Sequence, residues 1–159
     1  MKRLIAYFSA SGNTEKVAEI IKKTISADIF EIAPEEPYKD SDLKWINPLA
    51  RCNKEKIAGK DIAIARDVEG MRNYGLVFIG FPIWYYGAPN IINTFIKQYD
   101  FSNKKIALFA TSGGSDIVKT AEKLKPLLGE SANIIGAKRF YSDTSREVIE
   151  EWARQMTEK

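Results

Sequence analysis

The sequence predicts an α/β fold, a doubly wound parallel sheet of five strands with helices on both faces. Short apolar runs alternate along the chain with stretches of helical periodicity, which is typical of repeated strand–helix units. Several runs are apolar at nearly every position, as expected of parallel strands that are buried on both sides. Right-handed crossovers then place the helices in two layers around the sheet.

Five apolar runs are the predicted strands. They cover Arg3–Phe8, Ile29–Ile32, Leu76–Phe81, Ile106–Thr111 and Asn133–Phe140. The carboxyl ends of parallel strands lie at one edge of a sheet, and ligands bind there near the point where the strand order reverses. The loops after the first, third and fourth strands are therefore expected to share that edge.

Four apolar stripes with i, i+3, i+4 spacing predict helices that pack on the sheet. The first helix is expected over Glu15–Ile25, and the stripes are Val17, Ala18, Ile21 and Ile25; Ile91, Ile92, Phe95, Ile96 and Tyr99; Ile117, Val118, Ala121, Leu124 and Leu128; and Val148, Ile149, Trp152 and Met156. Pro89 suits the first turn of the second helix, and Thr144 with Glu147 forms a capping-box pattern for the last.

The segment from about 33 to 74 is less regular, and we interpret it as an excursion between the second and third strands. It begins with the turn-rich stretch Pro34–Tyr38. A helix is expected from about Asp42 to Lys56, with a bend or break at Pro48. Cys52 is interpreted as a packing residue, because no CxxC motif and no histidine activates it.

Composition narrows the classes of function. The 159 residues fit a single domain over 1–159, and a net charge of +3 without a dense Lys/Arg block argues against nucleic acid. One cysteine and no histidine exclude an intramolecular disulfide, Cys/His zinc sites and His-dependent triads, and no metal is expected. No signal-peptide pattern or membrane-spanning stretch is evident, so a cytoplasmic protein without a membrane partner is expected.

The loop Ser9-Ala10-Ser11-Gly12-Asn13-Thr14 lies between the first strand and its helix. The helix N-terminus offers free backbone N–H groups and the positive end of the helix dipole. Three hydroxyls and an amide add donors, and Gly12 allows close approach of a ligand. The alternative is a plain helix cap, which the same residue types favour. Because the loop has more hydrogen-bond donors than a helix cap needs, we interpret it as a phosphate-binding loop.

The loop Gly80-Phe81-Pro82-Ile83-Trp84-Tyr85-Tyr86-Gly87-Ala88-Pro89 follows the third strand. Its three consecutive aromatic residues suit stacking on a planar ligand. The alternative is that each ring packs on the next helix, which is about equally plausible for any single residue. Because the loop as a whole is expected to lie next to a phosphate-binding loop, we favour the interpretation that it lines one side of a ligand site.

The loop Thr111-Ser112-Gly113-Gly114-Ser115-Asp116 follows the fourth strand. Its two adjacent glycines expose backbone N–H groups that can donate to the carbonyl oxygens of a ring ligand. The alternative is a turn in which Ser115 or Asp116 caps the next helix, and both interpretations can hold together.

Together the three loops resemble those of short-chain flavodoxins, over nearly the whole chain. Ser-x-Ser-Gly-Asn-Thr resembles the loop that binds the FMN phosphate, and the stretch from Pro82 to Tyr85, closed by Pro89, resembles a flavin-stacking loop of one subgroup. Ser112-Gly113-Gly114 resembles the second loop that contacts the isoalloxazine. The resemblance implies a flavodoxin-like, three-layer α/β/α fold with FMN as the cofactor.

The resemblance also implies individual roles. Ser9, Ala10, Ser11, Gly12, Asn13 and Thr14 would hold the 5′-phosphate; Trp84 and Tyr85 would line the ring; Pro82, Ile83, Gly87 and Ala88 would shape that loop; and Thr111, Ser112, Gly113 and Gly114 would contact the pyrimidine end. Gly87 could permit a peptide rearrangement beside flavin N5. No side chain needs to act as acid, base or nucleophile, because the flavin carries the chemistry.

Two departures from the family pattern leave two functions open. Electron carriers of the family are usually acidic, whereas this chain is slightly basic, although Glu35, Glu36, Asp40 and Asp116 could form a local acidic rim. The third loop also lacks an aromatic residue to cover the flavin, unless Tyr38 or Trp45 of the excursion does so. We expect electron transfer with a redox partner protein, as a monomer or homodimer. The alternative is an FMN-dependent NAD(P)H oxidoreductase that reduces a quinone-like or other small acceptor.

Other classes that use related folds fit less well. Receiver domains need clustered carboxylates at the strand ends, but here the first and third strands end in Phe8-Ser9 and Gly80-Phe81. The P-loop motif Gly-x-x-x-x-Gly-Lys-Ser/Thr is absent. An NAD-binding domain needs Gly-x-Gly-x-x-Gly at the first turn, where this chain has Gly12 alone.

Overall fold

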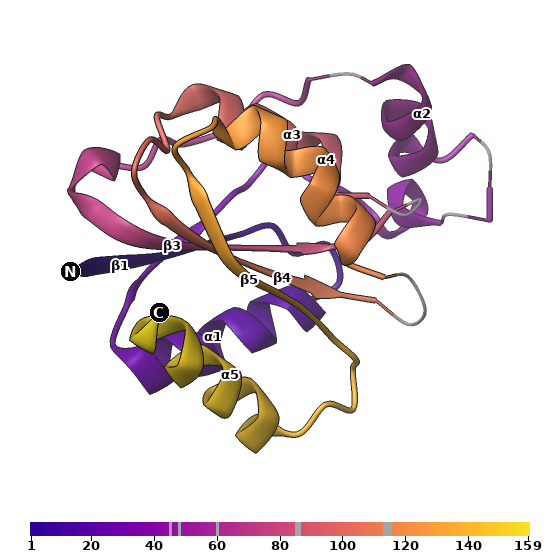
Figure 1. The fold of residues 1–159 in the computed structure, drawn as a ribbon. Helices are drawn as coiled ribbons and strands as arrows, with labels where there is room; N and C mark the ends of the chain where they lie inside the picture. The colour runs from indigo at the N-terminus through magenta and orange to yellow at the C-terminus, as the bar shows by residue number, and fades with distance from the viewer. Residues whose placement is uncertain (45, 48, 60, 85–86, 113–115) are drawn as a thin grey trace.

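Five parallel strands form the centre of the fold (Figure 1). The computed structural model describes residues 1–159 except 45, 48, 60, 85–86 and 113–115. The strands pair in the order β2-β1-β3-β4-β5, which confirms the expected doubly wound parallel sheet. Their bounds are β1 Lys2–Tyr7, β2 Asp28–Glu31, β3 Tyr74–Pro82, β4 Lys105–Thr111 and β5 Asn133–Phe140.

Helices cover both faces of this sheet. Figure 1 shows α1 and α5 on one face and α3 and α4 on the other, so the three-layer arrangement is confirmed. The α-helices are α1 Asn13–Ile25, α2 Arg51–Ala58, α3 Asn90–Gln98, α4 Val118–Leu128 and α5 Arg146–Glu158. None of the helices formed by the described residues is long and apolar enough to cross a membrane.

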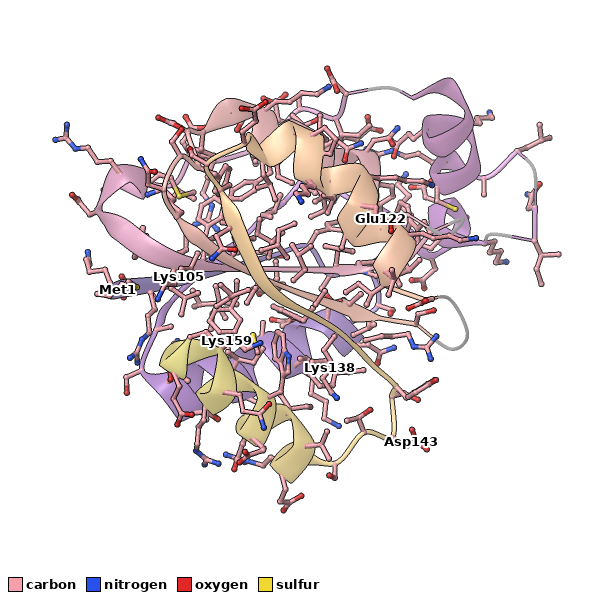
Figure 2. All side chains as sticks on the ribbon, in the orientation of Figure 1. Met1, Lys105, Glu122, Lys138, Asp143 and Lys159 are labelled. Carbon is pink, nitrogen blue, oxygen red and sulfur yellow. The ribbon has the colours of Figure 1, made fainter. Side chains whose placement is uncertain are left out.

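Buried side chains form one hydrophobic cluster on each face of the sheet, and they fill both layers in Figure 2. Beneath α1 and α5, the indole of Trp152 contacts the rings of Phe78, Phe109 and Phe140 at centroid distances of 5.8, 6.5 and 5.6 Å. The central strands β1, β3 and β4 contribute to both clusters, whereas the edge strands β2 and β5 are only partly buried. This position explains why the central strands are apolar at nearly every residue.

Two helix starts differ from the prediction. Val118 and Val148 are exposed rather than buried, while their neighbours Ile117 and Ile149 point into the core. Val118 is the first residue of α4 and Val148 lies in the first turn of α5, and each points about 100° away from its buried neighbour. The capping box with Thr144 is also wrong, because Ser145 is the N-cap and its hydroxyl accepts the Val148 N–H at 3.4 Å.

The excursion between β2 and β3 contains two short 3₁₀ helices, η1 Asp40–Leu43 and η2 Met71–Asn73, in addition to α2. The sequence predicts a helix from about Asp42 to Lys56 with a bend or break at Pro48. The part before the break is wrong as an α-helix, because it is the 3₁₀ helix η1, whereas α2 follows the break; Pro48 itself lies outside the described residues. At the break, the Asn47 side chain accepts the Leu49 N–H at 3.0 Å and the Asn47 carbonyl accepts the Ala50 N–H at 3.0 Å. A side-chain acceptor of this kind offers the backbone a turn in place of a helix.

Replacing Lys104 with methionine is expected to lower the free energy of unfolding by about 1–3 kcal/mol. Lys104 is only 7% exposed, and its Nζ donates to the carbonyl oxygens of Met71 at 3.0 Å and Tyr74 at 2.6 Å. Methionine keeps the apolar stem but removes this charged donor. Urea unfolding at pH 7 measures the change, with Lys105→Met as the control. Equal losses in the two variants would contradict the expectation.

Alkaline pH is expected to weaken the fold through Tyr7 and Tyr74. Burial and then the nearby Glu15 carboxylate raise the pKa of Tyr7 to about 12. A hydrogen bond to Asp28 and then burial raise the pKa of Tyr74 to about 12. The unfolded chain releases these protons near pH 10, so the folded state binds more protons above that pH.

The contribution of the two tyrosines to stability should therefore be complete below pH 10 and be lost between pH 10 and 12. Urea unfolding at a series of pH values tests this, and the double variant Tyr7→Phe, Tyr74→Phe should show a shallower decline than the wild type. Parallel curves for the two proteins would show that other groups cause the decline.

Candidate functional site

The three loops predicted to bind a ligand meet at the carboxyl edge of the sheet, because β1, β3 and β4 are neighbours there. The Phe8 N–H donates to the Gly80 carbonyl at 2.9 Å, and the Ile83 N–H donates to the Thr111 carbonyl at 3.1 Å. The hydroxyls of Thr14 and Thr111 are 2.8 Å apart. The structure thus brings together segments that are up to about a hundred residues apart in sequence.

Gly12 and Ser9 shape the first loop. Gly12 adopts a left-handed conformation with a φ of 95°, which glycine adopts without the strain that a Cβ brings. The Ser9 hydroxyl oxygen accepts the N–H groups of Gly12 at 3.1 Å and Glu15 at 3.2 Å. Since this oxygen is the acceptor in both bonds, the Ser9 hydroxyl hydrogen remains able to donate to a ligand.

The first turn of α1 leaves backbone donors for an anion. Among the hydrogen bonds of the described residues, none takes up the N–H of Asn13 or of Thr14. Ser11, Gly12 and Asn13 are exposed there, whereas Ala10 packs partly buried on the core. Thr14 is buried and its hydroxyl lies 2.8 Å from that of Thr111, so this side chain is engaged within the protein. These donors fit a phosphate group.

The second loop forms a narrow turn. The Trp84 N–H donates to the Gly87 carbonyl at 2.8 Å, and the Gly87 N–H donates back to the Trp84 carbonyl at 3.0 Å. Pro82, Ile83 and Trp84 are partly buried, and Gly87 and Ala88 are buried. Tyr85, which is expected to line the ring, and its neighbour Tyr86 lie outside the described residues.

Trp84 is held by aromatic contacts from two other segments. Its ring lies 5.7 Å from that of Phe8 and 5.7 Å from that of Tyr38, with interplanar angles of 89° and 82°. Tyr38 itself contacts Phe8 at 5.7 Å. Such edge-to-face pairs favour a defined orientation of each ring. The excursion therefore contributes Tyr38 to the aromatic group around Trp84. The sequence alone does not decide whether Tyr38 lies at the proposed site.

The third loop is described at its two ends. Thr111 ends β4, and the Ser112 N–H donates to the Phe140 carbonyl at 3.4 Å. The Asp116 carboxylate accepts the Val118 N–H at 3.2 Å, but the N-cap of α4 is Ile117, so the expected cap at Asp116 is wrong. Gly113, Gly114 and Ser115 lie outside the described residues, as does Trp45 of the excursion.

The larger of two hollows near this edge is not a suitable site for a flat ring. It measures about 520 Å³ and lies on the excursion. Its described lining consists of Glu35, Glu36, Arg51, Lys54, Glu55, Asp61, Ile62 and Ala63, with no aromatic side chain among them. A smaller hollow of about 120 Å³ lies between α1 and α5 beside Asn13 and Thr111. The three loops offer the better chemistry for a phosphate joined to an aromatic ring.

A cluster of three residues behind Trp84 is not among the predicted site residues. The Arg51 Nε donates to Glu55 Oε1 at 2.6 Å, and the Tyr38 hydroxyl donates to Glu55 Oε2. Burial and then the hydrogen bond to Glu55 raise the pKa of Tyr38. Arg51 and Glu55 are four residues apart, and this spacing on a helix is the only feature of the sequence that could have predicted their ion pair.

The sequence profile of the flavodoxin family matches residues 2–156, almost the whole chain. The chain belongs to this family. It is 27% identical over 135 residues to Flavodoxin 1 of Salmonella typhimurium strain LT2, covering 82% of this chain and 59% of the relative. It is 30% identical over 143 residues to the flavodoxin-like domain-containing protein BilS of Clostridioides difficile strain CD3, covering 86% and 64%. The chain thus spans about six tenths of the length of these curated relatives.

The fold of this flavodoxin family member is also similar to those of several solved structures. A candidate flavoprotein of Bacteroides eggerthii superposes with a TM-score of 0.89 at 37% identity, covering 99% of each chain. A flavoprotein of Lactobacillus acidophilus in complex with FMN gives a TM-score of 0.69 at 29% identity, covering 87% and 92%. Oxidised Flavodoxin 2 of Bacillus cereus, at 19% identity and a TM-score of 0.59 over 99% of each chain, shares the fold.

Replacing Ser9 with alanine is expected to lower the free energy of unfolding by about 0.5–2 kcal/mol, in the range of a lost helix cap. The reason is that the Gly12 and Glu15 N–H groups lose their acceptor. Ser11→Ala is the matched control, because Ser11 is an exposed serine of the same loop. Urea unfolding gives the energies, and faster amide exchange at Gly12 and Glu15 in the Ser9 variant alone locates the effect. Identical exchange in both variants would contradict it.

Proposed function

We propose that this chain binds FMN and acts in electron transfer. The observation that carries the proposal is the juxtaposition of two N–H groups that no described residue accepts, at Asn13 and Thr14, with a wall built on Trp84. The two features suit the two ends of FMN, its phosphate and its ring. Membership of the flavodoxin family and the FMN complex of the Lactobacillus acidophilus relative support this choice of cofactor.

The first loop would hold the phosphate by neutral donors. It contains no Lys or Arg, so the charge of the phosphate would be balanced by backbone N–H groups, the Ser9 and Ser11 hydroxyls, the Asn13 amide and the α1 dipole. Gly12 leaves open space on this side, since a Cβ there would meet nothing within 4 Å. A ligand can therefore approach the backbone of the loop directly.

The second and third loops would position the ring. Trp84 would cover one side and exclude water from it, while Pro82, Ile83, Gly87 and Ala88 would set the path of the loop. Thr111 and Ser112 would face the pyrimidine end. FMN supplies the redox chemistry when bound, and the protein binds it, orients it and tunes its potential through stacking and hydrogen bonds.

A second candidate is an FMN-dependent NAD(P)H oxidoreductase that reduces a small acceptor. The net charge of +3 favours it, because steering toward a basic redox partner would need a negative field. Glu35, Glu36, Asp40 and Asp116 are all exposed, and they remain candidates for an acidic rim that docks a redox partner.

Two measurements on the purified chain separate these functions. Added FMN should bind, with a change in its absorbance spectrum and quenching of its fluorescence. Mixing the loaded protein with NADPH then distinguishes carrier from reductase. An electron carrier should keep its oxidised spectrum until a partner reductase is added, whereas rapid bleaching by NADPH alone would support the oxidoreductase. Failure to take up FMN would refute both functions.

Trp84→Ala is expected to weaken FMN binding about 5- to 150-fold, because stacking of an aromatic side chain on a base contributes about 1–3 kcal/mol. Tyr99→Ala is the control, since Tyr99 is a partly buried aromatic residue, like Trp84, and lies at the C-terminal end of α3, outside the three loops. Fluorescence titration with FMN gives both dissociation constants. Equal affinities for the two variants would remove Trp84 from the proposed site.

A further inference from the structure

We propose that the Arg51–Glu55–Tyr38 cluster of the excursion orients Trp84, so that α2 controls how tightly the site holds a flavin ring. The three are positioning residues, because they act on the ligand through Trp84. The inference rests on the proposed function, in which Trp84 lines the ring.

Arg51 and Glu55 tie α2 to its surroundings. Their ion pair, Nε to Oε1 at 2.6 Å, is well shielded, with side-chain exposures of 19% and 12%. Arg51 Nη1 also donates to the carbonyl oxygens of Glu36 at 2.8 Å and Pro37 at 3.2 Å. The Glu55 carbonyl accepts Asn90 Nδ2 at 2.6 Å, which joins α2 to the start of α3. The pair is therefore fixed to both the turn before Tyr38 and the helix that follows the Trp84 loop.

The same two residues hold Tyr38 from two directions. Its hydroxyl donates to Glu55 Oε2, and the Arg51 guanidinium carbon lies 4.1 Å from the centroid of its ring. A cation over one ring face and a hydrogen bond at the ring tip restrict both the position and the rotation of the phenol. Because Arg51 covers one face, Tyr38 is suited to support a neighbouring ring rather than to stack on a ligand itself.

Tyr38 in turn supports Trp84. The two rings meet edge to face at 5.7 Å, and Phe8 contacts both of them. The backbone of Trp84 is held by its paired hydrogen bonds with Gly87. A ring with a fixed backbone and two aromatic neighbours has few orientations left, so loosening Tyr38 would release Trp84. Contacts thus run without interruption from α2 to the residue that would cover the ligand.

A second ion pair in this chain provides a matched control. Arg146 and Glu150 on α5 have the same four-residue spacing and the same Nε–Oε1 distance of 2.6 Å. The Arg146 side chain is 59% exposed, and no described ring contact involves either residue. Glu150 Oε2 also accepts Arg154 Nη2 at 3.4 Å, so each carboxylate has two donors. Removing one carboxylate in each cluster therefore compares a shielded cluster beside aromatic rings with a more exposed one that has no described ring partner.

The first experiment compares Glu55→Gln with Glu150→Gln. A glutamine carbonyl cannot replace both carboxylate oxygens, so Glu55→Gln leaves either Arg51 or Tyr38 without its acceptor. Loss of one such bond in a partly buried site should weaken FMN binding about fivefold to tenfold, whereas Glu150→Gln should stay within about twofold. Tyr38→Phe keeps the ring and removes the hydroxyl, and should act in the same direction as Glu55→Gln. Equal FMN affinities for all three variants and the wild type would overturn the proposal.

A double-mutant cycle then tests whether the effect passes through Trp84. In a Trp84→Ala background, Glu55→Gln should change FMN affinity by less than about twofold, because the group that it positions is gone. The same fivefold to tenfold loss in that background would show independent action and overturn the proposal. Urea unfolding of each variant accompanies the titrations, so a general loss of stability is recognised.

A readout without FMN keeps this inference separate from the proposed function. The fluorescence of Trp84 is obtained as the difference between each protein and its Trp84→Ala counterpart. Acrylamide should quench this fluorescence more strongly in Glu55→Gln than in wild type or Glu150→Gln. Unchanged quenching would overturn the positioning of Trp84. If the wild type does not bind FMN but quenching rises as expected, the positioning stands and the proposed function fails.

Discussion

The parallel pairing of β1, β3 and β4 is the constraint on which the site depends. Because these three strands are neighbours and run in one direction, the segments that follow them emerge at one edge of the sheet. Hydrogen bonds between these segments, such as that from the Ile83 N–H to the Thr111 carbonyl at 3.1 Å, then hold them at fixed separations. The burial of these strands on both faces leaves little freedom for the edge to shift.

Polar and aromatic groups are separated along this edge. Backbone donors and hydroxyls gather at the start of α1, and the rings of Phe8, Tyr38 and Trp84 gather beyond the end of β3. This division suits a ligand that is charged at one end and flat and apolar at the other. The proposed cofactor has this form, and so the arrangement of donors and rings carries the functional argument more than any single residue does.

The fold could be predicted from the sequence because its signals are local and repeated. Continuous apolar runs mark the central strands, and the stripe of Ile91, Ile92, Phe95 and Ile96 marks a helix that the structure confirms. The excursion could not be predicted to the same extent. The expected break at Pro48 lies beside Asn47, whose side chain accepts a backbone N–H in a turn. The segment before it forms a 3₁₀ helix in place of the expected α-helix, and local propensity does not decide between these forms.

The site shows the same limit. The loops could be located from their residue types, since glycine and hydroxyl residues between a strand and a helix favour a turn that exposes backbone donors. The hydroxyl of Thr14 could not be placed, because its partner Thr111 is 97 residues away. The link from Arg51 and Glu55 to Trp84 depends on how the excursion folds back onto the sheet edge. Contacts of this kind depend on tertiary structure and leave no periodic pattern in the sequence.

The Ser9 hydroxyl has a consequence for the rate at which a ligand is captured. By accepting two N–H groups of its own loop, it gives the turn a defined shape before any anion arrives. The entropy of ordering these residues is then lost during folding rather than during binding. An anion bound here as proposed would meet a turn that is already formed, so its capture would not need that turn to rearrange.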